Sequence, residues 1–187
     1  MKRWMLGPAL LAALLPGAAL FGANSTPPAA PQTDAGLTAR VAHEIVMYPW
    51  YGVWDAVDIQ VDNGHVALSG AVNQPVKKSD IESLVARVPG VAGVSNEIKV
   101  LPLSGFDDQL RLRLARAIYS DPALSRYAYL AQPPVHILVE NGHVTLVGVV
   151  NSQLEKNIAG ARASGAGLSF GPVTNNLVVE NPPAKKS

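Results

Sequence analysis

The chain has 187 residues, of which 48% are hydrophobic, with 15 basic and 14 acidic side chains and no cysteine. Without cysteine, neither a disulfide framework nor a thioether lipid anchor can form. The balanced charge argues against a duplex nucleic-acid partner, because phosphate binding normally requires a basic excess.

Residues 1–25 are predicted to be a secretory signal peptide. Lys2 and Arg3 precede an almost wholly apolar run, and Ala23-Asn24-Ser25 places small residues where signal peptidase cleaves. Prolines within the run make a retained membrane span the poorer interpretation. Without Lys2 and Arg3, 13 basic and 14 acidic residues remain, and the Pro- and Ala-rich residues 26–36 are predicted to be a flexible linker.

A first helix is predicted from apolar residues at helical spacing, namely Leu37, Val41, Ile45 and Tyr48. A β-hairpin follows over residues 57–73, where apolar residues alternate on both sides of Asn63-Gly64. This dipeptide favours a type I′ turn. A second helix is predicted to begin near Asp80 and to end before Pro89-Gly90, and a last strand runs from Val94 to Val100.

The hairpin recurs 78 residues later as residues 135–151, with Asn141-Gly142 at its turn. A helix with Leu110, Leu114, Ala117 and Ile118 on one face precedes it, and Asp107 and Asp108 suit the N-terminus of that helix. The copy's second helix, over residues 158–167, contains three glycines and is expected to be short or frayed. Its last strand is predicted to include Val173, Asn175, Leu177 and Val179.

The predicted fold is therefore α+β, with two tandem α-β-β-α-β modules. A helix between the last two strands permits parallel pairing, so each module should have a three-stranded mixed sheet with two helices on one face. The predicted boundaries are 37–102 for the first module, 103–106 for a linker, 107–182 for the second module and 183–187 for a tail.

Several short motifs in both copies resemble the BON domain. In the first copy they are Asn-Gly-His-Val and Leu-Ser-Gly-Ala-Val-Asn in residues 63–73, and Val-Pro-Gly-Val-Ala-Gly-Val followed by Ser-Asn-Glu-Ile-Lys-Val in residues 88–100. Residues 146–151 and 173–179 of the second copy are similar, but this copy has no equivalent of Gly90-Val91. The resemblance covers residues 37–182 and implies a bacterial envelope protein of a kind proposed to bind phospholipid or to help maintain membranes.

Aromatic residues concentrate between the first helix and first strand of each module. They are Tyr48, Trp50, Tyr51 and Trp54 in one module and Tyr119, Tyr127 and Tyr129 in the other. Trp and Tyr suit a boundary between apolar and wet surroundings, so these segments are candidates for contact with lipid head groups or a partner protein. The alternative is that they close each small core or pack the modules together.

The side of the copy's first helix opposite its core face is predicted to present Leu112, Ala115, Arg116 and Tyr119. Arg113, Arg116 and Arg126 would attract anionic head groups. A partly apolar stripe on the outer side of a helix also indicates that a partner covers it. That partner is either the other module or a lipid surface, and the alternative is that the stripe is an ordinary solvated surface.

Other polar and small residues are interpreted as structural. Asn63, Gly64, Asn141 and Gly142 form the turns, and Asn96 and Asn175 are expected to hydrogen-bond neighbouring backbone. Gly70 and Gly148 are expected to let a helix approach the sheet. His65, His136 and His143 lack the spacing of a zinc site, so no metal is predicted.

The sequence contains no nucleophile motif and no phosphate loop, and neither an enzyme nor a cofactor is predicted. The predicted function is an exported, periplasmic or membrane-peripheral envelope protein that binds anionic phospholipid or a membrane-bound partner, without nucleic acid. The alternative is a protein-interaction, scaffolding or stress-related chaperone-like module that ignores lipid. Oligomeric state is left open.

Overall fold

A computed structural model describes residues 33–167 and 169–180. The predicted signal peptide, most of the first linker and the tail lie outside these residues. The first module contains α1 (Asp34–Met47), β1 (Ala56–Asp62), β2 (His65–Val72), α2 (Pro75–Val85), β3 (Gly93–Asn96) and β4 (Lys99–Val100). The second contains α3 (Gly105–Tyr119), α4 (Ser125–Ala128), β5 (Val135–Glu140), β6 (His143–Val150), α5 (Gln153–Gly165), β7 (Thr174–Asn175) and β8 (Val178–Val179).

Both predicted hairpins form with tight two-residue turns. Asp62 pairs with His65 and Glu140 pairs with His143, so an Asn-Gly dipeptide alone makes each connection. All four turn residues have positive φ, at 48° and 81° in the first turn and 50° and 76° in the second. These angles are those of a type I′ turn, which Asn and Gly adopt at low cost.

The last strand of each module pairs parallel to the second strand, which makes the sheet mixed as predicted. This strand is in two pieces, because Asn96 and Asn175 turn their side chains back onto the backbone. Asn96 Oδ1 accepts from the N–H of Ile98 at 3.1 Å, and its Nδ2 donates to the carbonyl of Lys78 in α2 at 3.0 Å. Asn175 makes the same two bonds, to Leu177 and Lys156.

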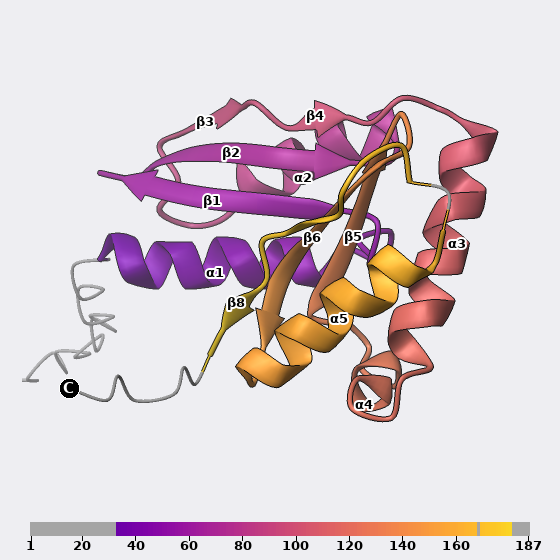
Figure 1. Cartoon of the computed structure of the whole chain (residues 1–187). Coiled ribbons are helices and arrows are strands. Elements are labelled where there is room, and N and C mark those ends of the chain that lie inside the picture. Colours follow the sequence, from indigo (N-terminus) through magenta and orange to yellow (C-terminus); the bar gives the residue numbers. More distant parts are fainter. Residues whose placement is uncertain (1–32, 168, 181–187) are drawn as a thin grey trace, which may run out of the picture. The chain divides into compact units, whose positions relative to one another are not determined.

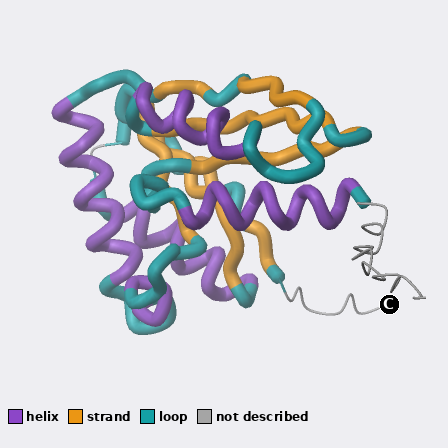
Figure 2. The backbone as a smooth tube through the Cα atoms, turned by 180° about the vertical axis from the view of Figure 1, so that it is seen from behind, coloured by secondary structure: helices purple, strands orange, loops and turns teal. Residues whose placement is uncertain are grey.

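The two long helices of each module, α1 with α2 and α3 with α5, lie on one face of its sheet (Figures 1 and 2). Each module has its own hydrophobic core between helices and sheet, with Val41, Leu68 and Ile81 at the centre of one and Leu114, Ile137 and Leu146 at the centre of the other. The predicted α+β fold with two tandem modules is confirmed.

The predicted start of α2 near Asp80 is wrong, because the helix begins at Pro75. Proline suits the first turn of a helix, where its fixed φ is already helical and its missing N–H has no intrahelical acceptor. Asp80 lies inside the helix, and its carboxylate accepts a hydrogen bond from the Tyr48 hydroxyl at 2.5 Å. The helix ends at Val85, a turn before Pro89.

The expectation of a short or frayed helix in the copy is also wrong, because α5 has 13 residues and α2 has 11. Ser152 caps α5, accepting from the N–H of Glu155 at 3.3 Å. Ala159 and Ala163 are buried against the sheet. Gly160 faces the side chain of Asn175, and an added Cβ there would lie 2.7 Å from Asn175 Nδ2. The small residues therefore give close helix–sheet packing.

Candidate functional site

The first connector, residues 48–55, directs most of its aromatic side chains inward. Tyr48 is buried in the core of its module, and burial together with the bond to Asp80 raises its pKa to about 12. Burial also raises the pKa of Tyr51 to about 12, and its hydroxyl oxygen accepts from the N–H of Val57 at 3.4 Å. Trp54 packs against the core of the second module. Of the four predicted contact residues here, Trp50 alone is largely exposed, at 70%.

A buried carboxylate that sequence reasoning missed fixes the shape of this connector. Asp55 is fully buried and accepts hydrogen bonds from the N–H groups of Gly52 and Asn73, both at 3.0 Å. Lys77 Nζ lies 2.7 Å from Asp55 Oδ2 and is itself buried. A buried charge is tolerated when it is paired and hydrogen-bonded in this way. No local sequence pattern marks Asp55, because its partners come from three segments.

The second connector, residues 120–134, is held to α5 by ion pairs. Glu155 contacts Arg126 Nη2 and accepts from the Tyr127 hydroxyl at 2.9 Å. Asp121 accepts from Arg162 Nε at 2.7 Å. Tyr127 is buried, which corrects the expectation that it contacts a ligand, and Arg126 is committed to Glu155. Tyr129 is 87% exposed.

The expected outer stripe of α3 includes two residues that face inward instead. Tyr119 and Ala115 pack on the core of the second module. The Tyr119 hydroxyl donates to the carbonyl of Val135, and burial raises the pKa of this tyrosine. Helical position alone does not reveal this, because a long side chain at the end of a helix can fold back onto the neighbouring strand.

The outer face of α3 retains Leu112, Arg113 and Arg116. Leu112 is 51% exposed, and both arginines are exposed. Among residues 33–167 and 169–180, neither arginine forms an ion pair or a side-chain hydrogen bond, whereas Arg111, Arg126 and Arg162 each contact a carboxylate. Two unpaired guanidinium groups therefore lie near one apolar side chain.

Each connector contacts an element of the other module, the first connector contacting β5 and the second contacting the end of α1. Gln132 Nε2 donates to the carbonyl of Val46 at 3.0 Å, and the N–H of Ile137 donates to the carbonyl of Val53 at 2.7 Å. His136 Nδ1 lies 3.2 Å from the Gly52 carbonyl, and its ring is 5.7 Å from that of Tyr51. Burial lowers the pKa of His136. Tyr51 and Trp54 therefore help to pack the two modules together, which is the alternative to contact with a lipid or a partner protein.

Exposed apolar side chains remain on the two segments that these bonds hold together. We call this set the connector patch, and it consists of Val46, Met47, Trp50, Tyr129 and Leu130. Of the predicted contact residues, Trp50 and Tyr129 belong to it. Met47 and Leu130 were missed because a single apolar residue near a helix end has no distinguishing pattern.

Both hairpin turns are held by an aspartate from the first turn of the preceding helix. The Asp107 carboxylate accepts from the N–H groups of Asn141 at 2.9 Å and Gly142 at 2.8 Å. Asp34 holds Asn63 and Gly64 in the same way, at 3.1 and 3.3 Å. Asp107 therefore does more than place a favourable charge at the N-terminus of α3, because it also holds the hairpin turn.

The expected role of Gly70 and Gly148 needs correction. Their φ angles are 102° and 118°. A Cβ on either residue would collide with the carbonyl of the first-strand segment opposite, at Ala56 or Pro134, and not with a helix. The two glycines permit a close approach of strands.

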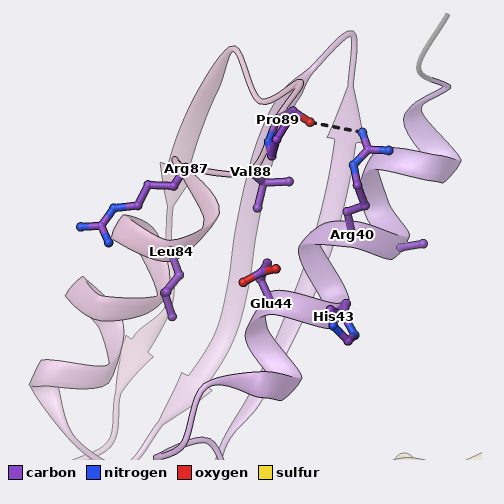
Figure 3. A pocket seen from close by; sticks show the side chains of 8 residues that line it. Arg40, His43, Glu44, Leu84, Arg87, Val88 and Pro89 are labelled. Atoms are coloured by element: carbon purple, nitrogen blue, oxygen red, sulfur yellow. Dashed lines mark hydrogen bonds between the residues drawn. The ribbon is translucent and has the colours of Figure 1, made fainter. Parts of the chain in front are cut away.

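A groove separates α1 and α2 on the outer side of the first module (Figure 3). Its volume is about 570 Å³. Its lining combines apolar residues with charged ones, namely Ala39, Arg40, His43, Glu44, Leu84, Arg87, Val88 and Pro89. Arg40 Nη2 donates to the carbonyl of Pro89 at 3.3 Å and so joins α1 to the loop after α2 at one end of the groove. Sequence reasoning did not find this groove, because its two walls lie about 45 residues apart.

Within the described part of the chain, no three His, Cys, Asp or Glu side chains are placed to hold a metal ion. Over the same residues, none of the helices is both long and apolar enough to cross a bilayer.

Comparison with known proteins gives a family. Among solved structures, the chain is similar to the C-terminal domain of CdsD, a structural protein of the type III secretion system of Chlamydia trachomatis, at 14% identity and a TM-score of 0.28. That match covers 74% of this chain and 63% of the other. A second CdsD structure gives 14% identity and a TM-score of 0.27, covering 78% and 94%.

No curated protein matches the chain. The family model of the BON domain matches twice, over residues 33–102 and 107–181, which together make up most of the sequence. Both matches contain one full set of helices and one mixed sheet. The chain belongs to the BON domain family.

Proposed function

We propose that this chain is an exported envelope protein that associates with phospholipid membranes, without catalysis or a cofactor. The observation that carries the proposal is the connector patch, in which an exposed Trp and an exposed Tyr belong to segments that also carry exposed aliphatic side chains and are joined by the bond from Gln132 to Val46. Trp and Tyr have an apolar body and a polar tip, and they favour the head-group layer of a bilayer.

The outer face of α3 supports the same function by its charge. Arg113 and Arg116 are exposed and unpaired within the described residues, and Leu112 lies beside them. A basic residue near an anionic membrane contributes about 1 kcal/mol of attraction. The guanidinium fork also matches the oxygens of a phosphate group.

Family membership agrees with a role at the envelope. BON domains are associated with envelope and membrane-related proteins, and the family is generally non-enzymatic. Lipid as the ligand and export by residues 1–25 are parts of our proposal.

Flotation with vesicles containing phosphatidylglycerol tests the proposal. The variant is Trp50→Ala/Tyr129→Ala, and we expect its bound fraction to correspond to an affinity roughly tenfold or more below that of the wild type, because two exposed rings lose their apolar contact. Leu154→Ala is the matched control, since Leu154 is 67% exposed on α5 and lies outside the patch. This control should float like the wild type.

Circular dichroism and thermal unfolding check that each variant keeps the fold. Equal flotation of the double variant and wild type would remove the connector patch from the function. Absence of flotation for the wild type, together with specific capture of one envelope protein, would favour the scaffolding or chaperone-like alternative. Because the attraction is partly electrostatic, binding should also weaken as salt rises.

A further inference from the structure

The backbone of β1 has hydrogen-bonding groups that point away from its sheet. β1 lies at the border of the first sheet and pairs with β2 on its inner side (Figure 1). Asp62 adjoins the two-residue turn and forms a hydrogen-bonded pair across it, so every second residue counted back from Asp62 points its N–H and C=O groups toward β2. The same groups of Val57, Ile59 and Val61 therefore point outward, and the Val57 N–H donates to the Tyr51 hydroxyl oxygen.

The matching groups of the second module are covered. Each outward-facing residue of β5 is bonded by a residue from outside its sheet, namely Val135 by Tyr119, Ile137 by Val53 and Val139 by Arg111. The α1 positions that match Tyr119 and Arg111 are Val46 and Thr38. Valine has no side-chain donor, and the Thr38 hydroxyl donates within α1, to the Asp34 carbonyl at 2.8 Å. The first module therefore lacks the side chains that cover the edge of β5.

The edge of β1 is open as a result. Over residues 33–167 and 169–180, no hydrogen bond satisfies the outward N–H and C=O groups of Ile59 and Val61. The side chains of these two residues are half-buried, whereas Ile137 and Val139 of the second module are 0% exposed. An extended segment that pairs with β1 would satisfy the backbone groups and complete the burial of the side chains.

The outer face of β1 carries acidic side chains that restrict such a segment. Asp58, Gln60 and Asp62 alternate with the apolar residues and are exposed. Neither aspartate forms an ion pair within the described part of the chain. Opposite charges across a strand pair stabilise it, and like charges destabilise it. The added strand should therefore have basic residues opposite Asp58 and Asp62 and apolar residues opposite Ile59 and Val61.

A second copy of this chain does not meet that requirement. If two β1 strands pair antiparallel about Ile59, each Asp58 lies diagonal to Asp58 and Asp62 of the other copy. A shift of this register by two residues in either direction places two carboxylates directly opposite each other. β1 contains no basic residue that would compensate for these repulsions.

We infer that the outer edge of β1 binds an extended segment of another protein, in which basic and apolar residues alternate, by antiparallel strand addition. The main-chain hydrogen bonds supply affinity, and the two aspartates select the basic side chains. The inference goes beyond the proposed membrane association, and the β1 edge shares no residue with the connector patch.

The test is an NMR titration of the full chain with the capped peptide Lys-Val-Thr-Val-Lys. Its lysines can face Asp58 and Asp62 while its valines bond to Ile59 and Val61. Amide hydrogen exchange of Ile59 and Val61 should slow about tenfold when the peptide concentration is about ten times the Kd, because exchange then requires dissociation. Exchange of the Ile137 N–H, which is already bonded, should not change.

Two altered peptides separate charge from strand pairing. The peptide Glu-Val-Thr-Val-Glu should bind about tenfold or more weakly, because its carboxylates would lie opposite the aspartates. A Lys peptide N-methylated at both valines keeps its charges but cannot donate to the β1 carbonyls, so its binding should be lost.

The protein variants test the same contacts from the other side. Asp58→Lys/Asp62→Lys should reverse the preference between the Lys and Glu peptides, a gain that a misfolded variant could not show. Glu97→Lys is the control for added positive charge, since Glu97 is exposed at the opposite edge of the same sheet. This control and Trp50→Ala/Tyr129→Ala should bind the Lys peptide like the wild type.

Unchanged exchange at Ile59 and Val61, equal affinity for the Lys and Glu peptides, or retained binding of the N-methylated peptide would each overturn the inference. Protection of the two amides that grows with protein concentration alone would assign the edge to a second copy and overturn it too. Failure of the peptide titration while the wild type still floats with vesicles would count against the β1 edge and leave the connector patch untouched.

Discussion

Asp107 shows how one residue can join two elements. Its carboxylate is buried and receives two backbone N–H groups of the Asn141-Gly142 turn, although it belongs to the first turn of α3. The equivalent Asp34 makes the same two bonds at longer distances and is half exposed. Solvent can therefore replace the Asp34 carboxylate more easily than the Asp107 carboxylate.

We therefore expect Asp107→Ala to lower the free energy of unfolding by about 2–4 kcal/mol, because one buried and one part-buried donor lose a charged acceptor. Asp34→Ala should cost less than half of that. Urea denaturation of the two variants and wild type measures both values. Equal losses for the two substitutions would show that burial of the carboxylate is irrelevant to the strength of this contact.

His136 gives a pH dependence to the contact between the first connector and β5. Burial lowers its pKa below the usual 6.5, so the imidazole is neutral in the folded chain at pH 7. The Gly52 carbonyl and Asp55 act in the opposite direction, favouring the charged form, but burial has the larger effect. A group with a lowered folded pKa contributes its full stability above the unfolded pKa and loses it as the pH falls through the folded pKa.

The wild type should thus lose unfolding free energy between pH 7.5 and pH 5, and His136→Gln should lose less over the same range. An NMR titration of the His136 ring should give a midpoint below 6.5. His143→Gln is the control, since His143 is exposed beside the second turn, and it should retain the wild-type pH dependence. A midpoint for His136 at or above 6.5 would contradict the argument.

At the scale of elements, Gly160 is a position where helix propensity and packing have opposite effects on stability. Alanine at a helical glycine normally stabilises by up to about 1 kcal/mol. At Gly160, however, the new methyl group would displace the Asn175 amide, which donates to the Lys156 carbonyl at 2.8 Å. We expect Gly160→Ala to lower the free energy of unfolding by about 1–3 kcal/mol.

Gly165→Ala is the matched substitution, because nothing lies within 4 Å of a Cβ at the end of the same helix. It should be neutral or slightly stabilising in the same urea titration. If Gly160→Ala were as stable as Gly165→Ala, close packing of α5 against the last strand would not explain its small residues.

The elements that depend on local residues were the ones that the sequence predicts well. The hairpins follow from Asn-Gly between alternating apolar residues, and α1 and α3 follow from a regular apolar spacing. The length of α5 was mispredicted because it depends on the fit of small residues against a distant strand, whereas the start of α2 was mispredicted although Pro75 marks it locally.

The candidate site was less predictable than the fold for the same reason. The aromatic residues of the connectors are evident in the sequence, but whether each one is buried depends on partners elsewhere in the chain. The Tyr48 hydroxyl donates to Asp80 and the Tyr127 hydroxyl donates to Glu155, whereas Trp50 and Tyr129 remain exposed. The α1–α2 groove has walls from two helices, and no sequence pattern marks such a pair.

At the scale of the whole molecule, the first strand of the second module is covered along its outer edge. The carbonyls of Val135 and Val139 accept from Tyr119 and Arg111 of α3, and the N–H of Ile137 donates to the carbonyl of Val53. The exposed edge of a sheet is a template for pairing with other chains, so covering this edge prevents such pairing.

The carbonyl that accepts from Ile137 comes from Val53 of the other module, and the neighbouring Trp54 packs against the core of the second module. A fragment cut before residue 107 would leave that N–H unsatisfied and bare the apolar surface beneath the indole. The two copies are therefore no longer interchangeable, because the first covers an edge and an apolar surface of the second. Separating them would expose that edge and that surface and make the second module prone to self-association.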